Sequence, residues 1–152
     1  MSDLRDVMRR FPHGVAVLTV DAEGERLGLT VASLVSLSLE PPLVGVAVSR
    51  QAAMHELLRG AGGFSLSLLA KGQEGLAQHF ARGVPPIAMW DRIEIHGDGA
   101  PLLDGALGWI ECRLADEVAT GDHTFFVGEV LSAEPGRNAA PLIHIGQEYR
   151  SL

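Results

Sequence analysis

The apolar positions of this chain fall into many short runs, and most of them have the spacing of β-strands. Leu34 to Leu39 alternates Leu or Val with Ser, the period of two expected for a strand with one polar face. Val15 to Val20 is apolar almost throughout and predicts a strand buried on both faces. Further runs predict strands at 26–32, 43–48, 64–69, 93–96, 109–114, 124–131 and 142–145.

In a few places the apolar spacing changes to that of an amphipathic helix. Such spacing predicts helices at 2–10, 51–59 and 73–82. Gly60 is expected to cap the second helix. The adjacent prolines Pro85 and Pro86 predict an irregular loop over 83–90, because neither fits a helix interior or a central strand.

Many short strands, with few helices and no regular alternation of the two, predict a mainly β (α+β) fold. The sheet is expected to be antiparallel and to close into a barrel. A chain of 152 residues corresponds to one domain, 1–152. Its 18 glycines and eight prolines agree with the many tight turns of such a fold.

The charge and the cysteine content exclude several classes of protein. A net charge of −7 argues against sequence-independent binding of DNA or RNA, which needs clustered Lys and Arg. The chain has no run of about 18 apolar residues, so no membrane span is predicted. Met1 to Arg10 lacks an apolar signal core, which makes the cytoplasm the expected location. The lone Cys112 has no partner for an internal disulfide.

The common catalytic and nucleotide-binding motifs are missing. There is no Gly-x-Gly-x-x-Gly after a strand, no Walker loop and no Gly-x-Ser-x-Gly elbow. The six histidines do not show metal-ligand spacing, and the pair Glu94 and His96 is a weak signal. No metal site is expected.

The sequence from 28 to 42 is the richest in candidate chemistry. Four hydroxyl residues, Thr30, Ser33, Ser36 and Ser38, crowd a segment that otherwise carries Val and Leu. Small side chains let a flat ligand approach the backbone, and hydroxyl and backbone groups can then bond its edge. The alternative interpretation is that these hydroxyls face water or pair across strands.

An ordered set of segments resembles the flavin reductase-like family, which includes the reductase components of two-component flavin-dependent monooxygenases. The resemblance extends over nearly the whole chain. Its most specific part combines Thr30-Val31-Ala32-Ser33 with Gly121-Asp122-His123 at this separation. Other matching segments are 11–19, 33–44, 63–69, 73–81, 99–103, 110–113, 123–130, 141–142 and 146–150.

This resemblance implies a Greek-key split β-barrel homodimer that reduces FMN or FAD by hydride transfer from NADH or NADPH. The reduced flavin would supply a partner monooxygenase. The flavin ring would lie against Thr30, Val31, Ala32, Ser33 and Ser36, and Ser38, Phe80 and Tyr149 complete the implied cofactor-binding set. His123 would be the catalytic residue beside the ring and the nicotinamide. Its alternative is a turn histidine held by Asp122 or Thr124.

The flavin phosphate would lie where the helix from Gln51 begins, beside Ser49 and Arg50. Here the chain departs from the family, which commonly has Ser and Thr where this sequence has Ala52, Ala53 and Met54. It also has Ala32 and Ser67 where Asn is frequent, and His144 where Tyr is frequent. These departures leave open a non-catalytic flavin- or nucleotide-binding barrel, and a haem- or pyridoxal-phosphate-binding relative is a further alternative.

Two further expectations concern large apolar side chains. The apolar strands at 15–20 and 125–131 suggest that a second copy of the chain covers part of them. Trp90, beside the predicted loop, is expected in the core, at a dimer interface, or over the flavin.

Overall fold

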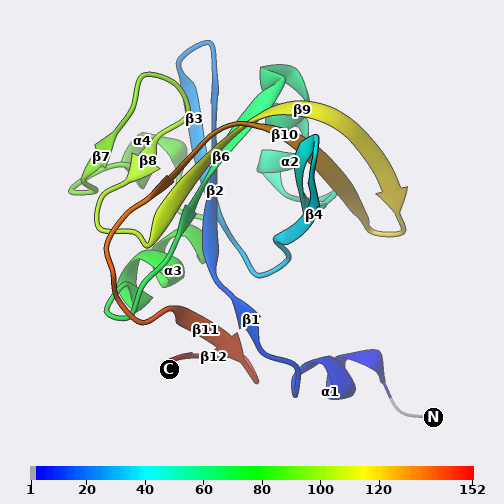
Figure 1. Cartoon of the computed structure of the whole chain (residues 1–152), viewed down its shortest axis with the longest axis vertical. Helices are drawn as coiled ribbons and strands as arrows, with labels where there is room; N and C mark the ends of the chain where they lie inside the picture. The colour runs from blue at the N-terminus through cyan, green and yellow to red at the C-terminus, as the bar shows by residue number, and fades with distance from the viewer. Residues whose placement is uncertain (1–2) are drawn as a thin grey trace.

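Seven antiparallel strands form one sheet that makes up most of the protein (Figure 1). The computed structural model describes residues 3–152. The strands of this sheet are β2 (Ala16–Ala22), β3 (Glu25–Val31), β4 (Val35–Leu39), β5 (Pro42–Ser49), β6 (Gly63–Leu68), β9 (Gly108–Thr120) and β10 (His123–Pro135). They are ordered β3-β2-β6-β9-β10-β5-β4 in space, so β2 pairs with β6 and β5 with β10 across long stretches of sequence.

The sheet closes where the end of β3 meets β5. Ser33, two residues after β3, donates its hydroxyl to the carbonyl of Ala47 at 2.9 Å and accepts the Ala47 N–H at 3.1 Å. The pairing of β4 with β5 reaches only to Gly45. The Ser33 side chain therefore takes the place of a backbone partner at Ala47. The predicted fold, an antiparallel split β-barrel with a few short helices, is confirmed.

Two helices pack against this sheet and complete its core. α2 (Ala53–Ala61) contacts β2, β5 and β6, and α3 (Glu74–Ala81) contacts β2 and β3. Leu58 of α2 is fully buried together with Leu18 and Leu66 of the strands. Burying each such side chain contributes roughly 1.5–3 kcal/mol relative to exposure. This packing fixes β3 and β5 on either side of the split.

The remaining elements lie around the barrel. β1 (His13–Gly14), β11 (Leu142–Ile145) and β12 (Glu148–Ser151) form a three-stranded sheet, and β7 (Ile95–His96) pairs with β8 (Leu102–Leu103). The short helices are α1 (Leu4–Met8) and α4 (Pro86–Met89). The carbonyl of Arg9, just after α1, accepts the N–H of Gly146 at 2.9 Å, which holds the end of α1 beside the turn from β11 to β12. Within residues 3–152, no helix is long and apolar enough to cross a membrane.

The strand predictions need correction in several places, and the two-residue strands β1 and β8 were not predicted. β9 and β10 extend well beyond 109–114 and 124–131, because their distal ends carry mostly exposed and polar side chains that give no apolar pattern. β12 was not predicted, since Glu148–Ser151 shows no apolar alternation. In β12 and in the distal ends of β9 and β10, pairing with the neighbouring strand, rather than an apolar pattern, holds the residues in place.

The helix predictions also differ in detail from the structure. The predicted start of the first helix at Ser2 lies outside the described residues. α2 begins at Ala53 instead of Gln51 and contains Gly60; the cap is Gly62, whose φ of 73° is left-handed. The loop predicted over 83–90 contains the one-turn helix α4. Pro86 stands at its first position, where a missing N–H does no harm.

Candidate functional site

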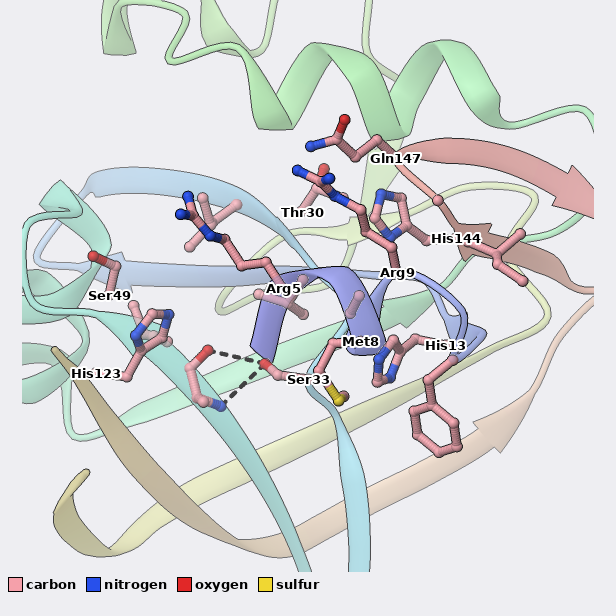
Figure 2. Close-up of a pocket in the computed structure, with 18 of the residues that line it drawn as sticks. Arg5, Met8, Arg9, His13, Thr30, Ser33, Ser49, His123, His144 and Gln147 are labelled. Atoms are coloured by element: carbon pink, nitrogen blue, oxygen red, sulfur yellow. Dashed lines mark hydrogen bonds between the residues drawn. The ribbon is translucent and has the colours of Figure 1, made fainter. Parts of the chain in front are cut away.

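A cavity of about 640 Å³ lies at the split of the barrel, a volume within the range of small-molecule sites. One part of its lining comes from the end of β3, from β5, and from the segment before α2: Leu29, Thr30, Val31, Ala32, Ser33, Ala47, Val48, Ser49 and Ala52, joined by His123 of β10. The other part comes from α1, β1 and the β11–β12 turn: Arg5, Met8, Arg9, Phe11, His13, His144, Ile145, Gly146 and Gln147. Figure 2 shows these two groups facing a shared space.

Six of the predicted site residues line this cavity: Thr30, Val31, Ala32, Ser33, Ser49 and His123. Two of the predicted hydroxyls are already engaged within the protein. Thr30 donates to the carbonyl of Ala77 at 2.6 Å, and Ser33 bonds Ala47. These hydroxyls therefore fix the strip 29–33 against α3 and β5, and the strip presents its backbone and small side chains to the cavity.

The other five predicted residues do not line the cavity. Ser36 and Ser38 lie on β4, beyond the lining strip. The Arg50 guanidinium donates to the carbonyl of Gly121 at 3.3 Å. Phe80 is 2% exposed and packs on Trp90, so it belongs to the core. The Tyr149 ring packs on His144, and burial raises the pKa of its phenol.

Trp90 belongs to the core of the barrel. Its indole N–H donates to the carbonyl of Arg26 at 3.2 Å, and its ring centroid lies 5.3 Å from that of Phe80. It does not line the cavity. Of its expected positions, the structure shows the one in the core.

His123 is held by Asp122, as its alternative interpretation expected, and it also lines the cavity. Its Nδ1 lies 2.7 Å from the Asp122 carboxylate, and this hydrogen bond holds the pKa of Asp122 below its usual value. His123 also pairs with Ser49 across β10 and β5 and lines the cavity. Asp122 thereby fixes the orientation of an imidazole that is 45% exposed and within reach of a ligand.

Several lining residues escaped the sequence analysis. Arg5 and Arg9 of the α1 segment and the strand partners His13 and His144 all line the cavity. A signal existed for the arginines, because residues four apart share one face of a helix. Nothing in the sequence showed that this face meets the β11–β12 turn.

Other chemically distinctive groups lie apart from the cavity. The buried His55 has its Nε2 2.6 Å from the Thr124 hydroxyl. Burial raises the pKa of Cys112 to about 12, so its thiol is inert at neutral pH. Within residues 3–152 no group of three or more His, Cys, Asp or Glu side chains is placed to hold a metal ion.

Comparisons with known proteins agree in pointing to one family. The family description "Flavin reductase like domain" matches residues 8–152. The chain is 42% identical, over 97% of its length and 83% of the relative's, to the NADH-dependent FAD reductase of Streptomyces globisporus. It is 39% identical to the reductase component of 4-hydroxyphenylacetate 3-monooxygenase of Thermus thermophilus, over 97% of this chain and 94% of that one.

A solved structure shares the whole architecture. The NADH:FAD oxidoreductase SgcE6 of Streptomyces globisporus, in complex with NAD and FAD fragments, superimposes with a TM-score of 0.92 at 38% identity. The match covers 98% of this chain and 90% of SgcE6. The resemblance found in the sequence is thus confirmed over nearly every residue, and the chain belongs to the flavin reductase-like domain family.

Proposed function

We propose that this protein is an NAD(P)H:flavin oxidoreductase that reduces FMN or FAD and passes the reduced flavin to a partner monooxygenase. The observation that carries the proposal is the cavity at the barrel split, which brings the strip 29–33 and His123 together. The relatives support it, because their names give NADH-dependent FAD and FMN reductases and a monooxygenase reductase component.

The lining of the cavity fits a flat aromatic ring. Ala32, Ser33, Ala47 and Ala52 are small, so a ring can approach the backbone between them. Leu29, Val31 and Val48 add apolar surface on the same side. A bound flavin supplies the two-electron acceptor, which takes a hydride from the reduced nicotinamide. Residues 29–33 would hold one ring, and the remaining space would admit the second against it, which provides proximity.

His123 would orient the nicotinamide or donate a hydrogen bond at the ring edge. The Asp122 carboxylate, at 2.7 Å from Nδ1, leaves Nε2 as the ring nitrogen available to a ligand. Because Ser49 pairs with His123 across the strands, the same end of the cavity adjoins the start of α2.

The start of α2 would hold the flavin phosphate. Its N-cap Ala52 makes no side-chain capping bond, and the Ser49 hydroxyl accepts the N–H of Gln51 at 3.2 Å. A phosphate there would take over backbone N–H groups that the sequence does not cap. Because Ala52 and Ala53 have no hydroxyl groups, the affinity for this phosphate would be lower than in family members with Ser and Thr.

A homodimer is part of the proposal, although one of its sequence arguments is wrong. Val15 to Val20 are buried within a single chain. Support comes instead from the outer strand β4, where Val35, Leu37 and Leu39 are 43%, 45% and 90% exposed. Leu131 of β10 is 66% exposed as well. A second copy of the chain would remove these side chains from water. The cytoplasmic location stays a prediction.

The test is anaerobic reduction of flavin. The purified protein with FMN or FAD and NADH or NADPH should bleach the flavin absorbance at a rate proportional to enzyme. Binding of flavin with no bleaching by either nucleotide would refute the reductase and favour the non-catalytic flavin-binding barrel, which the missing hydroxyls at Ala52 and Ala53 motivate. Light scattering at micromolar concentration tests the dimer.

A further inference from the structure

We propose that Arg9 binds a phosphate group of a nucleotide ligand at the end of the cavity opposite the start of α2. This inference rests on the proposed function and adds a second anion site to it. The chemistry to be recognised is a phosphate ester or diphosphate, carried by the flavin or by the nicotinamide nucleotide.

The charge of the cavity lining is the first observation. The protein has 19 acidic residues and a net charge of −7. Among the described residues that line the cavity there is no Asp or Glu, whereas two Arg and three His are present. The positive charge of this lining comes from the two guanidinium groups, and a ligand anion that takes one of them from its exposed Asp partner meets a local attraction in an otherwise acidic protein.

The position of Arg9 is the second observation. Its carbonyl accepts the N–H of Gly146 at 2.9 Å, so its main chain is held at the β11–β12 turn. In Figure 2 Arg9 lies toward Gln147 and His144, while Ser49 and His123 lie at the opposite side of the view. A phosphate at Arg9 is therefore a different site from a phosphate at the start of α2.

The carboxylates that already contact Arg5 and Arg9 indicate which arginine is more available to a phosphate. Arg5 bonds the Asp3 carboxylate through two nitrogens, at 2.8 and 3.2 Å. Arg9 meets Asp6 in a single contact of 3.5 Å between exposed side chains, a type of pair worth at most about 1 kcal/mol. A phosphate can displace the Asp6 contact easily, and it would meet a guanidinium suited to bidentate binding. Arg9 is thus the principal ligand residue.

The neighbouring side chains suit the same anion. His13 and His144 are cross-strand partners of β1 and β11, and both line this end of the cavity. Gln147 adds an amide donor from the turn. These groups can donate hydrogen bonds to phosphate oxygens.

The experiment compares ligands that carry phosphate with close analogues that lack it. Arg9→Gln is measured against wild type, with Arg10→Gln as the matched control. Arg10 is the next residue, carries the same charge and does not line the cavity. Flavin dissociation constants are measured by fluorescence for FAD, FMN and riboflavin. Turnover is measured with NADH and with N-benzyl-1,4-dihydronicotinamide, a hydride donor without phosphate.

We expect Arg9→Gln to weaken the binding of the phosphate-bearing ligand about tenfold, which is the usual effect of losing one charged hydrogen bond. The affinity for the phosphate-free analogue of the same ligand should change less than about twofold. Arg10→Gln should leave all affinities as in wild type. A loss with FAD or FMN but not riboflavin assigns the flavin phosphate. A rise in KM for NADH, with the KM for the benzyl donor unchanged, assigns the phosphate of the nicotinamide nucleotide. In about 1 M salt, where the Debye length is about 3 Å, the difference should shrink.

Equal losses for ligands with and without phosphate, no loss at all, or an equal loss in Arg10→Gln would each overturn the inference. Thermal unfolding of the variants checks that they are folded, and Arg9→Lys should recover part of the affinity. Failure of the proposed function is a separate result, because it is absence of turnover in the wild type. The comparison of FMN with riboflavin binding still tests the arginine in that case.

Discussion

The contact between Ser33 and Ala47, where the end of β3 meets β5, allows a direct test of whether the Ser33 hydroxyl stabilises the barrel or binds the ligand. Ser33 was predicted to bond a flavin, yet its hydroxyl bonds the N–H and the carbonyl of Ala47 at 3.1 and 2.9 Å. Replacing Ser33 with Ala removes both hydrogen bonds and leaves two partly buried backbone groups of β5 without that partner. A typical hydrogen bond contributes about 0.5–1.5 kcal/mol net. The free energy of unfolding should therefore fall by about 1–3 kcal/mol.

The assay is urea unfolding followed by circular dichroism, at one fixed protein concentration and without flavin. The midpoint should fall while the slope stays constant, and the melting temperature should drop by about 2–4 °C for each kcal/mol lost. Ser36→Ala is the matched control, because Ser36 is exposed on β4. A surface substitution of this kind should stay within about 0.5 kcal/mol of wild type.

The stability and the flavin affinity of Ser33→Ala together decide between the two roles of the hydroxyl. If Ser33→Ala unfolds like wild type but loses flavin affinity, the hydroxyl serves the ligand and the split does not depend on it. If stability falls and flavin affinity falls with it, Ser33 acts through the position of the strip 29–33. The two measurements on one variant thus separate a structural hydroxyl from a ligand-binding one.

Three further predictions address catalysis, packing and reactivity. His123→Ala should lower kcat/KM for flavin reduction about tenfold or more; His96→Ala, which removes a similarly exposed imidazole bonded to Asp104 at 2.6 Å, should not. Gly28→Ala should destabilise the protein by about 1–3 kcal/mol in thermal unfolding, because a Cβ there would lie 2.6 Å from the Phe80 ring; an unchanged melting temperature would contradict this packing. The Cys112 thiol, with a pKa raised by burial to about 12, should react with a thiol reagent at pH 8 only after unfolding. Since the unfolded thiol ionises at lower pH, the free energy of unfolding should also fall as pH rises from about 9 toward 12.

Local patterns in the sequence determined much of the fold. The alternation in Leu34 to Leu39, the apolar run at 15–20 and the helical spacing at 73–82 each mark an element that the structure contains. The strand at 15–20 and the helix at 73–82 could be predicted because burial within the chain imposes a pattern that the residues themselves carry. The alternation of β4 has another origin, because its apolar side chains Val35, Leu37 and Leu39 are exposed in the single chain. The family could be identified for the same kind of reason, since its segments occur in order along the chain.

Only the tertiary structure decided what the individual site residues do. Ser33 and Ala47 are 14 positions apart, and their bond exists because the sheet curls until β3 meets β5. Phe80 lies in the core because α3 packs on β3, although its place in the sequence also suited a ligand contact. Arg9 joins the cavity because its carbonyl meets Gly146 of a distant turn. Pairing between segments far apart depends on how their faces fit together, and that fit is a property of the assembled barrel that no single segment contains.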